Sequence, residues 1–151
     1  MKKDRKFVIA AAIILILSIV AVAAIKKMIK QSERNAVNRV QAFAYEINYN
    51  YKHPENIYQY LSEAFRSQMT KEEFIEAFNK ERSYPYLTPL FINYESIELS
   101  EDYLNGTAVF SQAARLPGMI YELPFVFENG DYYMIAFDEF LDGSYLEKFE
   151  E

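Results

Sequence analysis

Cysteine and tryptophan are absent from this chain of 151 residues, and histidine occurs once. Without cysteine the chain forms no disulfide and offers no cysteine for lipid attachment, which is compatible with an exported domain and with a cytosolic one. A zinc site needs several His or Cys ligands, and His53 is the single candidate. The sequence therefore predicts no metal and no cofactor.

Glycine and, after residue 39, basic side chains are also scarce. The four glycines lie at turns or breaks rather than in a phosphate-binding loop: Gly106, Gly118, Gly130 and Gly143. Residues 1–39 carry nine Lys or Arg and two acids. Residues 40–151 carry seven Lys or Arg and twenty acids, which gives this part of the chain a net charge of −13. An acidic domain repels phosphates, and this excludes nucleic acid as a partner.

One long apolar run is present. Residues 7–25 contain no charged side chain and would span about 28 Å as a helix, close to the roughly 30 Å hydrocarbon core of a bilayer. This predicts a transmembrane helix. The alternative is a cleaved signal peptide, with a basic start and Ala21-Val22-Ala23 as the cleavage site. Because the run exceeds the usual apolar core of a signal peptide and Lys26-Lys27 follow it, we favour the uncleaved anchor.

Basic side chains flank this run on both sides, at Lys2, Lys3, Arg5, Lys6, Lys26, Lys27 and Lys30. They suit anionic lipid headgroups. A tail with four basic side chains is hard to translocate, so we expect a cytoplasmic N-terminus and a globular part outside the cell membrane. The expected organisation is a basic tail (1–6), a transmembrane helix (7–25), a polar helical stalk (26–35), a globular domain (36–146) and an acidic tail (147–151).

Three helical segments are expected next. Helix continues over Ile25–Asn50, with apolar residues on one face of a 3.6-residue period: Ala36, Val37, Val40, Phe43, Ala44 and Ile47. A second helix begins at Pro54, because proline at the first helical position loses no needed N–H. A third begins at Thr70, which has the capping-box spacing to Glu73, and ends near Arg82.

Strands are expected from residue 87. Residues 91–100 alternate with one change of parity, which a bulge near Glu95-Ser96 explains, and 107–116 form a second strand before a type II turn at 116–119. The plainest signal is a hairpin over 119–141 with Asn129-Gly130 as its type I′ turn. Its register places these pairs on the core face: Phe127/Tyr132, Phe125/Met134, Leu123/Ala136 and Tyr121/Asp138.

This order predicts an α+β fold: an N-terminal transmembrane helix, then three helices on one face of a curved four-stranded antiparallel sheet. The order, the amphipathic helix after the anchor, the stretch Met69–Phe78 (MTKEEFIEAF) and the closing aromatic hairpin resemble the small membrane-tethered members of the nuclear transport factor 2-like superfamily, over about 35–145. The resemblance implies a cone-shaped fold with a pocket between sheet and helices. Members include isomerases, dehydratases and non-catalytic binding domains, so function stays open.

Few side chains are candidates for chemistry. Asp138 opposite Tyr121 would lie at the mouth of the cone pocket and could act as a general acid or base; the alternative is a hydrogen bond between the two at a sheet edge. His53 has no orienting carboxylate or second ligand evident and is interpreted as a surface residue. The acids Asp138, Glu139 and Asp142 lack the spacing of a calcium loop and are interpreted as a solvated strand end.

Most aromatic side chains fall at core positions by their period. The candidates for a partner surface are Tyr49, Tyr51, Tyr84 and Tyr86. The leading hypothesis is a single-pass, membrane-anchored, extracytoplasmic binding or assembly domain without catalytic activity. The alternatives are a small-molecule enzyme of isomerase or dehydratase type that uses the cone pocket, and an accessory subunit of a membrane complex. A filled interior would favour the binding domain, and an open cavity with two converging polar groups the enzyme.

Overall fold

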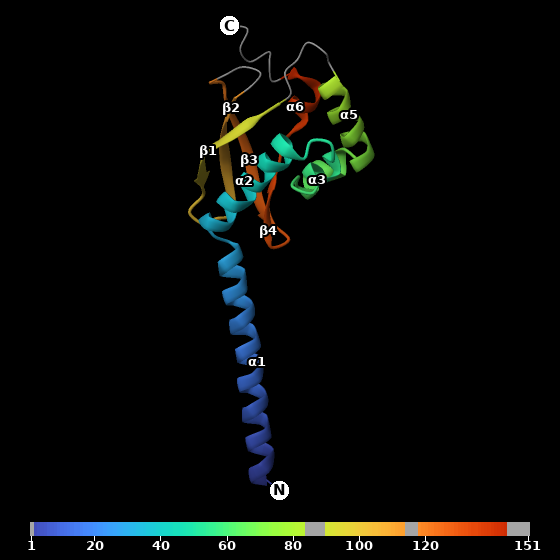
Figure 1. The fold of residues 1–151 in the computed structure, drawn as a ribbon. Coiled ribbons are helices and arrows are strands. Elements are labelled where there is room, and N and C mark those ends of the chain that lie inside the picture. Colours follow the sequence, from blue (N-terminus) through green and yellow to red (C-terminus); the bar gives the residue numbers. More distant parts are fainter. Residues whose placement is uncertain (1, 84–89, 114–117, 145–151) are drawn as a thin grey trace.

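The chain is α+β, with a four-stranded antiparallel sheet of order β1-β2-β3-β4 (Figure 1). The computed structural model describes residues 2–83, 90–113 and 118–144, without the side chains of 2–11 and 27–29. The elements are α1 (Lys2–Lys30), α2 (Glu33–Tyr49), α3 (Pro54–Tyr58), α4 (Glu63–Gln68), α5 (Lys71–Ser83), β1 (Ile92–Leu99), β2 (Asn105–Gln112), β3 (Ile120–Glu128), β4 (Asp131–Met134) and α6 (Asp138–Asp142).

Helix α1 projects away from the sheet and the other helices (Figure 1). Its described side chains, those of residues 12–26 and Lys30, are exposed. In the described part of the chain, no helix has the length and apolar character that crossing a bilayer requires. The prediction of a transmembrane helix over 7–25 is therefore wrong, and so is the predicted single-pass location with the domain outside the cell membrane.

Helix does not continue unbroken from residue 25 to 50, as the sequence predicted. It stops at Lys30 and restarts after Ser32, whose hydroxyl accepts a hydrogen bond from the Asn35 N–H at 3.4 Å and so caps α2. The predicted apolar stripe of α2 is buried apart from Val37, which is half-buried, and α2 packs against both β1 and β4. The stripe is thus what attaches this helix to the sheet.

The segment after Pro54 forms two short helices instead of one. Between α3 and α4, Gln59 and Tyr60 form a turn, and Leu61 makes a parallel bridge with Met134 of β4. The Ser62 N–H donates to the Met134 carbonyl and the Met134 N–H to the Tyr60 carbonyl, both at 2.8 Å. Helix α5 follows with the predicted capping box, in which the Thr70 and Glu73 N–H groups each donate to the other's side chain, at 2.8 and 3.3 Å.

Sheet register agrees with the local signals in the sequence. The β1–β2 register shifts between Tyr94 and Ser96, which confirms the predicted bulge. The turn residues Asn129 and Gly130 have φ of 51° and 83°, and Glu128 faces Asp131 as expected. Strand β2 begins at Asn105, two residues before the prediction, and the predicted turn at 116–119 lies mostly outside the described residues.

The predicted second strand of the hairpin ends early. Pairing stops after Ile135, whose N–H donates to the Pro124 carbonyl at 2.9 Å, and the chain then turns into α6. Helical spacing directs Phe137, Phe140 and Leu141 inward together, which a strand would not allow. The predicted pairs Leu123/Ala136 and Tyr121/Asp138 are therefore wrong.

Aromatic rings fill the space between the helices and the sheet. Phe43 of α2 is fully buried, and its ring centroid lies 5.5 Å from Phe137, 6.1 Å from Tyr60 and 6.3 Å from Phe110. Phe74 of α5 continues this cluster, 6.0 Å from Phe137. The region where the resemblance implied a pocket is thus occupied by packed rings.

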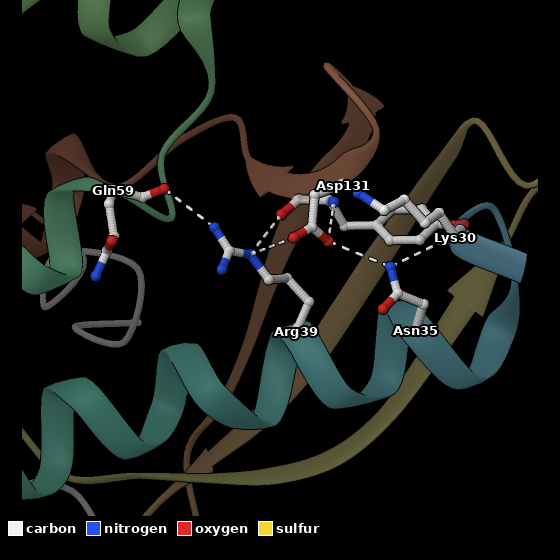
Figure 2. Close-up of polar contacts among 6 residues, drawn as sticks. Lys30, Asn35, Arg39, Gln59 and Asp131 are labelled. Carbon is white, nitrogen blue, oxygen red and sulfur yellow. Dashed lines mark hydrogen bonds and ion pairs between the residues drawn. The ribbon is translucent and has the colours of Figure 1, made fainter. Parts of the chain in front are cut away.

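Arg39 connects α2 to two other parts of the fold (Figure 2). Its Nε donates to the Tyr132 carbonyl and its Nη2 to the Gln59 carbonyl, both at 3.1 Å. Nε also lies 3.7 Å from Asp131 Oδ2, and the guanidinium stacks 3.9 Å from the Tyr60 ring centroid. Asn35 adds a hydrogen bond of 3.2 Å to the other Asp131 oxygen. One helix face therefore fixes both the hairpin and the end of α3.

We expect Gly130→Val to destabilise the fold by about 1–3 kcal/mol, because a β-branched residue is strained at positive φ. An added Cβ would meet no atom closer than 3.7 Å, so crowding contributes little. Gly130→Asn is the control and should lose much less, since asparagine tolerates this region. Equal denaturant midpoints for all three proteins would contradict the type I′ turn.

We expect Arg39→Met to cost roughly 2 kcal/mol, because two backbone carbonyls and a carboxylate lose a charged donor. Arg39→Lys should recover less than half of the loss, since an ammonium cannot make the planar fork or the stack on Tyr60. Urea unfolding at low and high salt is the measurement. Full recovery by lysine, or a loss that disappears in high salt, would show that simple charge pairing is the main effect.

Candidate functional site

The two edges of the sheet differ in how far they are covered. The β4 edge is paired with the segment from Tyr60 to Ser62. On the β1 edge, Ile92 is the one residue that the described part of the chain covers: the Asn48 side chain accepts from the Ile92 N–H at 2.9 Å and donates to its carbonyl at 2.7 Å. The amide of Asn48 thus takes the place of a neighbouring strand at one residue of β1.

Aromatic side chains gather where α2 passes this edge. Tyr45 and Tyr49, one helical turn apart, are 55% and 61% exposed, with ring centroids 5.0 Å apart. Phe91 lies 5.8 Å from Tyr49 in an edge-to-face contact. With Tyr94 and Asn48 they line a surface cleft of about 320 Å³. Such a cluster, with apolar faces and polar tips, is typical of partner surfaces.

A second cleft of about 300 Å³ lies at the other end of β1. It is lined by half-buried Ile97 and Leu99, by exposed Tyr103, and by the acids Glu33 and Glu101. Burial raises the pKa of Tyr94, and the Glu33 carboxylate adds to this shift. Along β1, Tyr94 of the aromatic cleft is followed by Ile97 and Leu99 of the acidic cleft. We call the two clefts together the α2–β1 groove.

Backbone groups of β1 also face this edge. Phe91 bonds to Ala113 and Ser100 to Asn105, at 3.1 and 2.9 Å, and alternate residues of an antiparallel strand face the same way. The N–H and C=O groups of Ile97 and Leu99, like those of Tyr94, therefore point away from β2. Within the described residues, no hydrogen bond to these outward groups is found.

The predicted pair Asp138 and Tyr121 is not brought together. The buried Tyr121 hydroxyl donates to Gln112 Oε1 at 2.9 Å, and its ring packs against Phe140. Asp138 is exposed at the start of α6, where its carboxylate accepts from the Phe137 N–H at 3.3 Å. Neither the acid–base arrangement nor a Tyr–Asp hydrogen bond forms.

Asp138 does line a cleft of about 320 Å³ between α5 and α6, with Lys80, Glu81 and Asp142 as the other charged residues. A hydrogen bond from the Ser144 side chain, together with one from the Ser144 N–H at 2.9 Å, holds the pKa of the Asp142 carboxyl below its ordinary value. His53 is exposed and lies 3.2 Å from Glu55. Among the described residues, no cluster of His, Asp or Glu has the arrangement of a metal site.

Of the predicted surface tyrosines, only Tyr49 lies in the α2–β1 groove. Tyr51 packs under Arg82, whose guanidinium lies 3.9 Å from the ring centroid, and Tyr84 and Tyr86 are outside the described residues. Sequence reasoning missed Tyr45, Phe91 and Tyr94. The spacing of Tyr45 and Tyr49 on one exposed helical ridge was a usable signal, whereas their proximity to Phe91 depends on the fold.

Comparisons with protein-family models, curated proteins and solved structures found no match for the chain. The resemblance to the nuclear transport factor 2-like superfamily therefore stays a prediction.

We expect Asn48→Ala to destabilise the fold by about 1–3 kcal/mol, because the Ile92 N–H and carbonyl both lose their partner. Asn48→Asp keeps the acceptor for the N–H but places a carboxylate against the carbonyl, so it should recover only part of the loss. Amide hydrogen exchange at Ile92 should accelerate in both variants. Unchanged exchange there would mean that the side chain does not seal the edge.

Proposed function

We propose that the chain is a binding or assembly domain without catalytic activity, and that it contacts its partner through the α2–β1 groove. The observation that carries this proposal is the filled interior. Phe43, Phe74, Phe110 and Phe137 are at most 1% exposed and occupy the space that an enzyme of this architecture would need for its substrate. The partner would then bind on the surface, where exposed aromatic side chains gather on one side.

The negative charge of the domain indicates which kind of partner it would bind. Residues 40–151 carry a net charge of −13, and Glu33 and Glu101 lie on the rim of the groove. A negative surface attracts cations and repels nucleic acid and other polyanions, over a range set by a Debye length of about 8 Å at physiological salt. The proposed partner is therefore cationic or neutral at its contact site.

The test is a titration of the ¹⁵N-labelled full chain with hexalysine and, separately, with duplex DNA, at low and high salt. Hexalysine should shift the amides of the groove and lose affinity at high salt, and DNA should shift none. The double variant Glu33→Gln/Glu101→Gln should weaken the hexalysine response. The control Glu122→Gln makes the same kind of change at an exposed position on β3 and should have little effect.

Two results would contradict the proposal. Tight binding of DNA would show that the acidic surface does not select the partner. Hexalysine shifts centred on the cleft between α5 and α6, around Asp138 and Lys80, would place the binding surface elsewhere.

A further inference from the structure

The outer face and the inner face of the β1 edge differ in chemistry. Glu95 and Glu98 are exposed, and Glu95 accepts a hydrogen bond from Ser111 of β2. On the inner face, Tyr94, Ile97 and Leu99 are half-buried and pack against the core from its margin. A chain segment beside β1 would therefore meet carboxylates on one face and apolar side chains on the other.

Strand pairing between two copies does not fit this edge. If β1 lay antiparallel to β1 of a second molecule, glutamates of both strands would be brought together on the outer face, and like charges on paired strands are destabilising. The bulge at Glu95 and the charged side chains are features that protect edges from self-association. An oppositely charged strand meets no such obstacle.

We propose that β1 accepts an extended peptide segment of alternating basic and apolar residues as an additional antiparallel strand from Tyr94 to Leu99. The proposal rests on the proposed function and names its ligand class. The N–H and C=O groups of Ile97 and Leu99, which point away from β2, bond to the segment. Its apolar side chains lie beside Ile97 and Leu99, and its basic side chains lie opposite Glu98 on the outer face. Asn48 occupies the edge at Ile92 and ends the pairing there.

The probe is the peptide acetyl-Lys-Val-Lys-Val-Lys-Val-amide, titrated into the full chain by calorimetry. Two isomers are compared with it, one N-methylated at the three valines and one at the three lysines. In antiparallel pairing the residues opposite Ile97 and Leu99 direct their N–H groups to β1, and these are the valines. Valine methylation should therefore weaken binding by about tenfold or more, and lysine methylation should have little effect.

A charge variant tests the outer face. Glu98→Lys should weaken binding of the lysine peptide by about tenfold and allow binding of the matching Glu-Val peptide. Glu122→Lys is the matched control, because it is exposed on β3 and makes the same charge change away from the β1 edge. Amide exchange at Ile97 and Leu99 should slow in the complex, while exchange of the amides that already face β2 stays unchanged.

The outcomes separate the two proposals. Equal affinity of both methylated isomers, or failure of the parent peptide to bind, overturns strand addition. If hexalysine nevertheless shifts the amide signals of the α2–β1 groove, the groove is retained as the proposed binding surface and only strand addition is rejected. Dimers of the free chain in which amide exchange at Ile97 and Leu99 slows would show that β1 pairs with a second copy, and this also overturns the proposal.

Discussion

The position of α2 depends on the Arg39 guanidinium, which makes four contacts through one rigid group. It bonds to the carbonyls of Tyr132 and Gln59 and pairs with Asp131 (Figure 2). It also stacks on the Tyr60 ring. The hairpin and the α3–α4 segment are thereby held at one distance from the helix. Because the buried stripe of α2 also packs on β1, the same helix brings its exposed tyrosines to the far edge of the sheet.

The aromatic core and the surface groove follow from the same arrangement. Phe43 and Tyr49 belong to one helix, and they differ in the face on which they lie: Phe43 is fully buried among rings, whereas Tyr49 is 61% exposed beside Phe91. The buried face packs its side chains into the interior between the helices and the sheet. The exposed face leaves large side chains where a macromolecule can reach them. Structure and proposed function are connected through this division.

Local signals in the sequence predicted local structure well. Asn129-Gly130 determined the hairpin register, Thr70 and Glu73 the start of α5, and the parity change at Glu95 the bulge. Errors arose where tertiary packing decides. Ser32 interrupts a helical pattern because its hydroxyl caps a new helix, and Phe137 and Phe140 turn a predicted strand into α6 because both rings enter the core. The groove joins α2 to β1 across more than forty residues of sequence, which no local pattern encodes.

The coverage of β4 by the segment from Tyr60 to Ser62 limits how the described sheet can associate. Molecules whose sheets have two unpaired edges can pair edge to edge into a fibre of unlimited length. Here the β4 edge is paired within the chain, so each described sheet can pair with a neighbour at the β1 edge alone. Any assembly made through sheet edges alone ends at a pair, and the folded domain cannot propagate a fibre by that route.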